Sequence, residues 1–182
     1  VTGLEIQPDL VAIARKNIAL NDYHHQFQVK EGEGADINTV FQPEMFSLVI
    51  TNPPFYMNNS GRLNKNLEAL TARHQQGNSL SEFVQAAAYC LKNRGRFVII
   101  YPAGSLPSLF HELNGKKLAP KRARFIYSYP QNKAEAKLVL VEALKNGGSG
   151  MRFEQPLYIY DHKNGPYTDE IVKMYDTGMV NG

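Results

Sequence analysis

Asn52, Pro53, Pro54 and Phe55 form the segment of the chain whose residue types best suit chemistry. They directly follow an apolar run at residues 46–51, which reads as a buried strand. In open α/β sheets, ligands bind beyond the carboxyl ends of strands, so the segment stands where a site is expected. The two prolines fix φ and remove two backbone donors, which makes a rigid turn with carbonyl groups held in place.

Such a turn can hold a planar amine. The side-chain oxygen of Asn52 and the backbone carbonyl of Pro53 can accept hydrogen bonds from an exocyclic NH₂, while Phe55 offers a flat face for stacking. This arrangement aims the nitrogen lone pair at an approaching methyl group, a reaction that needs positioning more than a strong base. A stiff strand-ending turn with no chemical role explains the same residues, and this alternative stays open.

The elements around this segment predict an α/β fold with a mostly parallel sheet. Leu10, Ala14 and Ile18 predict an amphipathic helix, and a second helix runs from Leu80 through Leu91 until Gly95 ends it. The run at 46–51 predicts a strand covered on both faces. We expect further strands at 4–6, 27–29 and 97–101, a short helix at 106–113, an antiparallel hairpin of 125–129 with 138–144 at a sheet edge, and a last helix near 170–175.

Positive charge gathers in two places, although the whole chain carries only 20 basic against 17 acidic residues, a net charge of +3. Residues 56–78 read as a long loop or lid that contains Arg73 and His74. The second and denser cluster consists of Lys116, Lys117, Lys121, Arg122 and Arg124. Both clusters can follow a phosphate backbone, and a solvated surface is the alternative for each.

The remaining features are typical of a single cytoplasmic domain. The 182 residues suffice for one core, with a flexible link at 146–150 and a tail at 151–182. Cys90 reads as a buried structural thiol, the five histidines lack metal-ligand spacing, and no apolar run is long enough to span a membrane. Tyr158 and Tyr160 share one strand face, where a plain edge-strand surface is favoured over stacking on RNA.

The sequence resembles the Rossmann-like S-adenosylmethionine-dependent methyltransferases whose fourth motif reads Asn/Asp-Pro-Pro-aromatic. Within them it is similar to the bacterial adenine-N6 methyltransferases of valine tRNA, over most of residues 1–175. The matching segments are Gly3-Leu4-Glu5-Ile6, residues 46–55, Ala72-Arg73-His74, Gly95-Arg96-Phe97, residues 120–125 and residues 138–143.

The resemblance implies S-adenosylmethionine as cofactor and the N6 amine of adenine in RNA, with tRNA expected, as methyl acceptor. It implies that Glu5 binds the ribose hydroxyls and that Asp36 holds the cofactor adenine, with Glu33 as a competitor for that role. It places the target base against the motif that starts at Asn52, with Tyr56 as a second aromatic wall. Asn52 is also expected to contact the cofactor. Relatives often have tyrosine where this chain has Phe55.

The chain departs from the family pattern at its start. The resemblance implies a first strand and a glycine-rich loop before Val1, and Gly32-x-Gly34 is no substitute because it follows a later strand. We therefore expect a doubly wound sheet that lacks its central strand between those ending at Ile6 and Thr51, and weak cofactor binding by this truncated chain. A monomer is expected. The alternatives are a glutamine-amide methyltransferase acting on protein, and a non-catalytic RNA-binding module.

Overall fold

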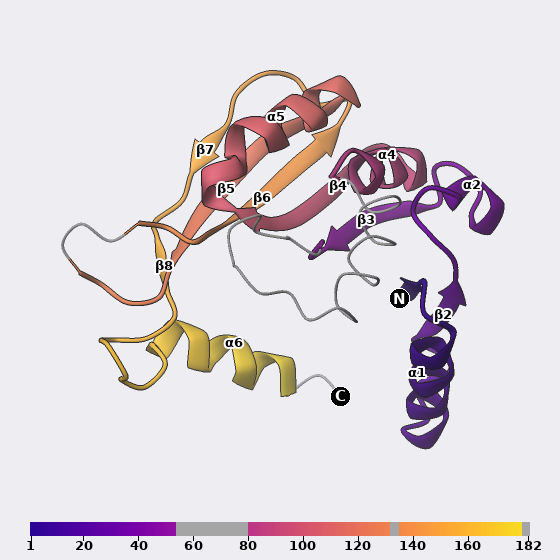
Figure 1. Ribbon diagram of the computed structural model, residues 1–182, viewed down its shortest axis with the longest axis horizontal. Coiled ribbons are helices and arrows are strands. Elements are labelled where there is room, and N and C mark those ends of the chain that lie inside the picture. The colour runs from indigo at the N-terminus through magenta and orange to yellow at the C-terminus, as the bar shows by residue number, and fades with distance from the viewer. Residues whose placement is uncertain (54–79, 132–134, 180–182) are drawn as a thin grey trace, which may run out of the picture.

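The computed structural model describes residues 1–53, 80–131 and 135–179, and side chains as far as residue 176 (Figure 1). These residues form a mixed α/β fold with two sheets. Most strand neighbours run parallel, and the antiparallel pairs are confined to β6 with its two neighbours. The predicted Rossmann-like fold class, with an antiparallel C-terminal hairpin, is confirmed.

The smaller sheet contains β1 (Thr2–Glu5) and β2 (Gln28–Glu31), joined by helix α1 (Pro8–Leu20). The strands are parallel, with Thr2 opposite Gln28 and Glu5 opposite Glu31. Pro8 begins the helix, because proline has a helical φ and lacks the N–H that a first turn leaves unpaired. The sequence predicts Leu10 on the buried face of this helix, but Leu10 is 43% exposed and its neighbour Val11 is buried instead.

The larger sheet has the order β3 (Phe46–Thr51), β4 (Leu91–Pro102), β6 (Leu138–Lys145), β5 (Leu118–Tyr127) and β7 (Arg152–Phe153). Strand β8 (Leu157–Tyr158) also pairs with β5. The predicted hairpin is present as β5 and β6, but β6 lies between β4 and β5 and not at the edge. Because β5 begins at Leu118, Lys121, Arg122 and Arg124 of the basic cluster lie in a strand.

The second predicted helix is shorter than expected. Helix α4 (Leu80–Cys90) ends before Leu91, which already pairs with Phe46 of β3. Residues 92–95 form an irregularity within β4, where Arg94 has a φ of 63°. An added Cβ on Gly95 would lie 2.8 Å from the carbonyl oxygen of Lys92, so glycine allows the chain to fold back closely here.

The core lies between the larger sheet and two helices, α4 and α5 (Leu106–Gly115). Figure 1 shows both helices lying along this sheet, with the short helix α2 (Ile37–Val40) beside α4. The 3₁₀ helix η1 (Ala103–Ser105) leads from β4 into α5. The fully buried side chains come from every layer: Val84, Leu91, Phe97, Ile99, Leu109, Leu113, Leu118, Val139 and Val141.

Strand β3 is covered on one face only. Val49 packs against the core, whereas Leu48 is 38% and Ile50 is 69% exposed. The prediction that residues 46–51 are buried on both faces is therefore wrong for the face that carries Ile50. No backbone pairing joins β1 or β2 to β3 in the part of the chain that the structure describes. The expected central strand between them stays a prediction.

The C-terminal residues return to the same sheet. After β6, the segment at 146–150 is held by Lys121, whose ammonium donates to the carbonyl oxygens of Gly148, Ser149 and Gly150. The final helix α6 (Asp169–Met179) follows β8 and lies apart from α4 and α5 in Figure 1.

Among the helices described, none is long and apolar enough to cross a membrane.

Candidate functional site

Asn52 and Pro53 lie where β3 ends, as the sequence predicts for the start of the motif. Asn52 is exposed and Pro53 is buried. The buried proline anchors the turn, while the exposed amide can accept a hydrogen bond from a ligand at the strand end. The rest of this predicted site, Pro54, Phe55 and Tyr56, lies outside the described residues, as do Arg73, His74 and the predicted loop or lid at 56–78.

Glu5 is the last residue of β1 and is half-buried. Its Oε1 accepts a hydrogen bond from the backbone N–H of Gln7 at 2.9 Å, and its carbonyl accepts one from the N–H of Gly32 at 3.0 Å. These contacts fix the strand end and one carboxylate oxygen. The other oxygen can accept a bond from a ribose hydroxyl, so the residue fits the role that the resemblance implies.

Asp36 follows β2 and precedes α2, with an exposed side chain that makes no capping hydrogen bond. Its carbonyl accepts bonds from the N–H and hydroxyl of Thr39, at 2.9 and 2.8 Å. The backbone is therefore ordered while the carboxylate remains available for an amine. Glu33, the competitor for this role, is half-buried, and its carbonyl accepts the N–H of Asp36 at 3.2 Å.

Close packing positions the loop at 32–36, which follows β2 and carries Asp36. A Cβ added to Gly32 would lie 2.7 Å from Cγ2 of Val40 and 3.2 Å from Cδ1 of Leu4, so the loop needs glycine there. Because β1 and β2 are parallel, Glu5 and the loop that carries Asp36 leave the same edge of the sheet. A second core cluster of Ile37, Phe41 and Cys90 then packs α2 against α4 and β3.

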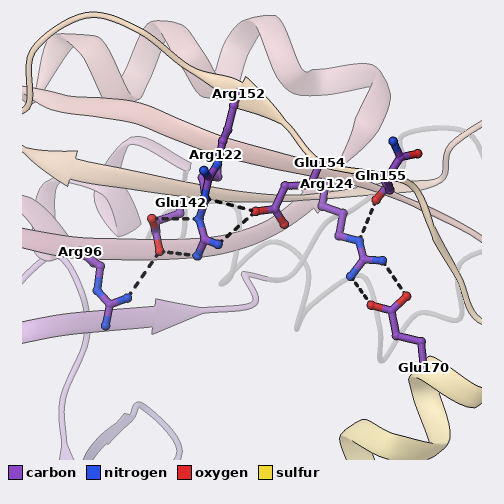
Figure 2. A network of polar contacts seen from close by, with 8 residues as sticks. All are labelled: Arg96, Arg122, Arg124, Glu142, Arg152, Glu154, Gln155 and Glu170. Atoms are coloured by element: carbon purple, nitrogen blue, oxygen red, sulfur yellow. Dashed lines mark hydrogen bonds and ion pairs between the residues drawn. The ribbon is translucent and has the colours of Figure 1, made fainter.

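The arginines of the basic cluster are engaged within the protein (Figure 2). Arg122 donates from Nε and Nη2 to Glu142 at 3.1 and 2.9 Å, and from Nη1 to Glu154 at 3.0 Å. Arg124 donates to both carboxylate oxygens of Glu170, at 2.6 and 2.7 Å. These bonds raise the pKa of both guanidinium groups and lower the pKa of Glu142 and Glu170. An RNA phosphate would have to compete with these carboxylates.

The lysines of the cluster differ in their surroundings. Lys116 donates to Oε1 of Gln85 at 3.2 Å, and Lys121 holds the segment at 146–150. Lys117 is exposed, with a φ of 58°. Sequence analysis did not propose two more exposed arginines that end the network in Figure 2, Arg96 and Arg152. Arg96 lies opposite Leu144 of β6, on the same sheet face as Glu142, and no local sequence pattern indicates this pairing.

Cys90 is buried at the end of α4, as predicted. Desolvation raises the pKa of its thiol, which Lys145 lowers to a smaller extent. A protonated, buried thiol is a poor nucleophile, so this cysteine serves the core. Within residues 1–53, 80–131 and 135–179, no three side chains of His, Cys, Asp or Glu are grouped as metal ligands.

Comparisons with known proteins agree with the fold. A family model described as N-6 DNA Methylase matches residues 1–119. The chain is 22% identical over 173 residues to a tRNA1(Val) (adenine(37)-N6)-methyltransferase of Flavobacteriaceae bacterium (strain 3519-10), covering 95% of this chain and 70% of that one. It is 25% identical over 144 residues to the protein of the same name from Porphyromonas gingivalis (strain ATCC 33277), covering 78% of this chain and 55% of that one.

A solved structure supports the fold. The predicted O-methyltransferase Atu636 of Agrobacterium tumefaciens superposes with a TM-score of 0.74 at 17% identity, covering 97% of this chain and 76% of that one. The family match spans well over half of the chain, including both cofactor candidates and the start of the motif at Asn52. The chain belongs to the N-6 DNA methylase family, whose members are S-adenosylmethionine-dependent methyltransferases.

Proposed function

We propose that this protein transfers the methyl group of S-adenosylmethionine to the N6 amine of adenine in RNA, and that the RNA is a tRNA. The observation that carries the proposal is the exposed amide of Asn52 on a buried proline at the carboxyl end of β3. The relatives named as tRNA adenine-N6 methyltransferases support the choice of acceptor. The chain spans 55% of one of those relatives, so the whole protein's substrate remains part of the proposal.

Each residue of the candidate site has a role in the proposal. Bound S-adenosylmethionine supplies an activated methyl group. Glu5 accepts hydrogen bonds from the ribose, and Asp36 accepts one from the cofactor's adenine amine. Oδ1 of Asn52 and the carbonyl of Pro53 accept the two N–H bonds of the target amine, which points its lone pair away from them. Pro54 stiffens the turn, and Phe55 and Tyr56 stack on the extruded base.

Contact with the RNA backbone falls to the basic residues. Lys117 is best placed for phosphate, because it is exposed and lies at the start of the basic strand β5. Arg122 and Arg124 can contact phosphate only by exchanging it for carboxylates that they already bind, Glu142 and Glu170. The proposed contacts are Lys116, Lys117, Lys121, Arg122 and Arg124, together with Arg73 and His74 from outside the described residues.

A titration with a matched pair of variants tests the cofactor site. Glu5 and Glu31 lie opposite each other at the ends of β1 and β2, so one charge can be removed beside the other. S-adenosylhomocysteine is titrated calorimetrically into the wild-type chain, Glu5→Gln and Glu31→Gln. We expect Glu5→Gln to weaken binding about tenfold or more and Glu31→Gln to leave it unchanged. Equal effects of the two variants contradict the role of Glu5.

Transfer of a labelled methyl group tests the acceptor. We expect labelling of adenine in a tRNA transcript, loss of labelling in Asn52→Ala, and unchanged binding of S-adenosylhomocysteine by that variant. Labelling of a glutamine-containing protein in place of RNA would support the glutamine-amide alternative. The same measurements on a version lengthened at its N-terminus by upstream coding sequence test the expected first strand. Binding of cofactor to neither version contradicts the enzyme proposal.

The second candidate is a non-catalytic RNA-binding module. The observation that favours it is the absence of backbone pairing between β1 and β3 within the described residues, which leaves the strands that carry Glu5 and Asn52 in separate sheets. RNA binding that persists in Glu5→Gln and Asn52→Ala, without methyl transfer by any version, would support this function.

A further inference from the structure

Three tyrosine rings form a continuous cluster at the C-terminal side of the fold. The rings of Tyr160 and Tyr167 are stacked, with centroids 5.2 Å apart and planes 14° apart. Tyr175 of α6 continues the series, 5.9 Å from Tyr167 at 42°. The three residues are 37%, 44% and 58% exposed, so ring surface remains open to solvent along the whole series.

Backbone contacts hold these rings in place. Tyr160 and Tyr167 face each other in an antiparallel bridge, and the N–H of Tyr160 donates to the carbonyl of Ser128 at 2.8 Å. The hydroxyl of Thr168 donates to the carbonyl of Tyr158 at 2.8 Å. A surface ordered in this way loses little conformational entropy when a ligand binds, which favours recognition by rigid aromatic side chains.

Helix α6 brings the third ring into the series. Its Glu170 pairs with Arg124 of β5, as Figure 2 shows, and its Ile171 is buried. The ion pair ties the start of the helix to β5 of the larger sheet. Tyr175 then lies one turn beyond Ile171, where it reaches Tyr167.

Charge near the cluster selects the kind of ligand. Between residues 160 and 176 the basic residues are Lys163 and Lys173, and the acidic ones are Asp161, Asp169, Asp176 and Glu170, the last paired with Arg124. This balance gives an RNA phosphate backbone no net attraction, so binding of RNA here must come from its bases. A flat, uncharged ring gains most from such a surface, because stacking depends on contact between π faces and tolerates any base.

We propose that Tyr160, Tyr167 and Tyr175 form a stacking platform for unpaired bases of the RNA substrate. The inference rests on the proposed function, in which one adenine amine is methylated. Single-stranded loops, whose bases are unstacked, are the RNA segments that proteins read by aromatic stacking, and an enzyme that modifies a base must take it out of its stack. Other unpaired bases of the same RNA therefore need a surface, and we assign the tyrosine platform to them.

A single tryptophan can report on this contact, because the chain contains none. Tyr167→Trp keeps an aromatic ring in the platform, and its fluorescence is measured during titration with short single-stranded oligoadenylate. Tyr23→Trp is the matched control, since Tyr23 is 42% exposed and contacts Phe27 at 5.9 Å outside the platform. We expect quenching in Tyr167→Trp only, and we expect it to persist at raised salt.

Other results would overturn the platform. These are equal quenching in both variants, no quenching in either, or quenching that salt abolishes, which would indicate phosphate contacts. Quenching by an aromatic peptide and not by oligoadenylate would assign the surface to a protein partner.

Tyr175 provides a test by substitution. We expect Tyr175→Ala to weaken binding of a tRNA transcript about tenfold and Tyr175→Phe to leave it unchanged, because the phenyl ring retains the stacking face. Neither should change the affinity for S-adenosylhomocysteine. Quenching without methyl transfer by any version would support the platform and contradict the proposed function. Methyl transfer to RNA without quenching would do the reverse.

Discussion

Arg122 and Glu142 are joined by two hydrogen bonds across β5 and β6, Nε to Oε1 at 3.1 Å and Nη2 to Oε2 at 2.9 Å. The two residues are partners in the antiparallel register, and the Glu142 side chain is only 17% exposed. Strand pairing thus converts a basic residue of the sequence into part of an internal charge network. A guanidinium fixed by two parallel bonds has little freedom to follow a mobile anion.

Glu142→Gln should lower the free energy of unfolding by about 1–2 kcal/mol, because it weakens charge-assisted bonds in a partly desolvated place. The measurement is chemical denaturation of the variant and the wild type. Glu135→Gln is the control, since Glu135 is exposed and lies outside the network. Similar losses in the two variants would show that the Arg122 pair contributes nothing specific.

Acid should weaken the fold partly through Glu142. Its pKa lies below the ordinary 4.5, chiefly because Arg122 donates hydrogen bonds to the carboxylate. A carboxylate with a lowered pKa in the folded state stabilises the protein at every pH above its ordinary pKa. This contribution is lost as the pH falls through the lowered pKa. Denaturation midpoints measured from neutral to acidic pH should fall less steeply in Glu142→Gln. Identical profiles would refute this assignment.

Glu170→Gln should release helix α6 locally. Glu170 accepts both of its close bonds from Arg124, so the neutral amide weakens the link between the helix and β5. Hydrogen exchange should become faster in α6 and stay unchanged in β4 and β6. Asp176→Asn, an exposed change in the same helix, is the control. Faster exchange throughout the sheet would mean that the ion pair supports the whole fold.

Gly32→Ala should destabilise the protein by about 1–3 kcal/mol, because the new methyl group overlaps Cγ2 of Val40. The double variant Gly32→Ala with Val40→Ala should recover part of the loss beyond additivity. Gly104→Ala is the control, since an added Cβ there meets nothing within 4 Å. Denaturation midpoints decide the matter, and strictly additive losses would place the strain elsewhere.

Two isoleucines on neighbouring strands test the uncovered face of β3. Ile99 of β4 is fully buried, and Ile50 of β3 is 69% exposed. Ile99→Ala should cost about 2–5 kcal/mol, whereas Ile50→Ala should cost less than about 1 kcal/mol. If the two substitutions cost the same, another segment or molecule covers the face of β3 in solution.

The strand-end position of Asn52 could be predicted from the sequence, because the apolar run before it and the two prolines after it act locally. The sequence predicts the strand that carries Glu5 at 4–6, and the strand lies at Thr2–Glu5. Local sequence gave the wrong end for helix α4, since Leu91 is apolar in either a helix or a strand. Pairing with Phe46 decided between them, and pairing is a long-range interaction.

The sequence by itself determined the α/β class, the approximate places of the helices and most strands, and the two carboxylates and one amide offered for a cofactor and an amine. The fold class and the elements follow from periodicity and turn chemistry within short windows, whereas the roles expected of the two carboxylates rest on the resemblance to the methyltransferases. The tertiary structure decided which surface charges and rings contact one another. Sheet pairing put Arg122 beside Glu142, and the return of the C-terminal residues to β5 brought Tyr160, Tyr167 and Tyr175 together. Contacts between distant segments depend on strand register and topology, which a local pattern does not contain.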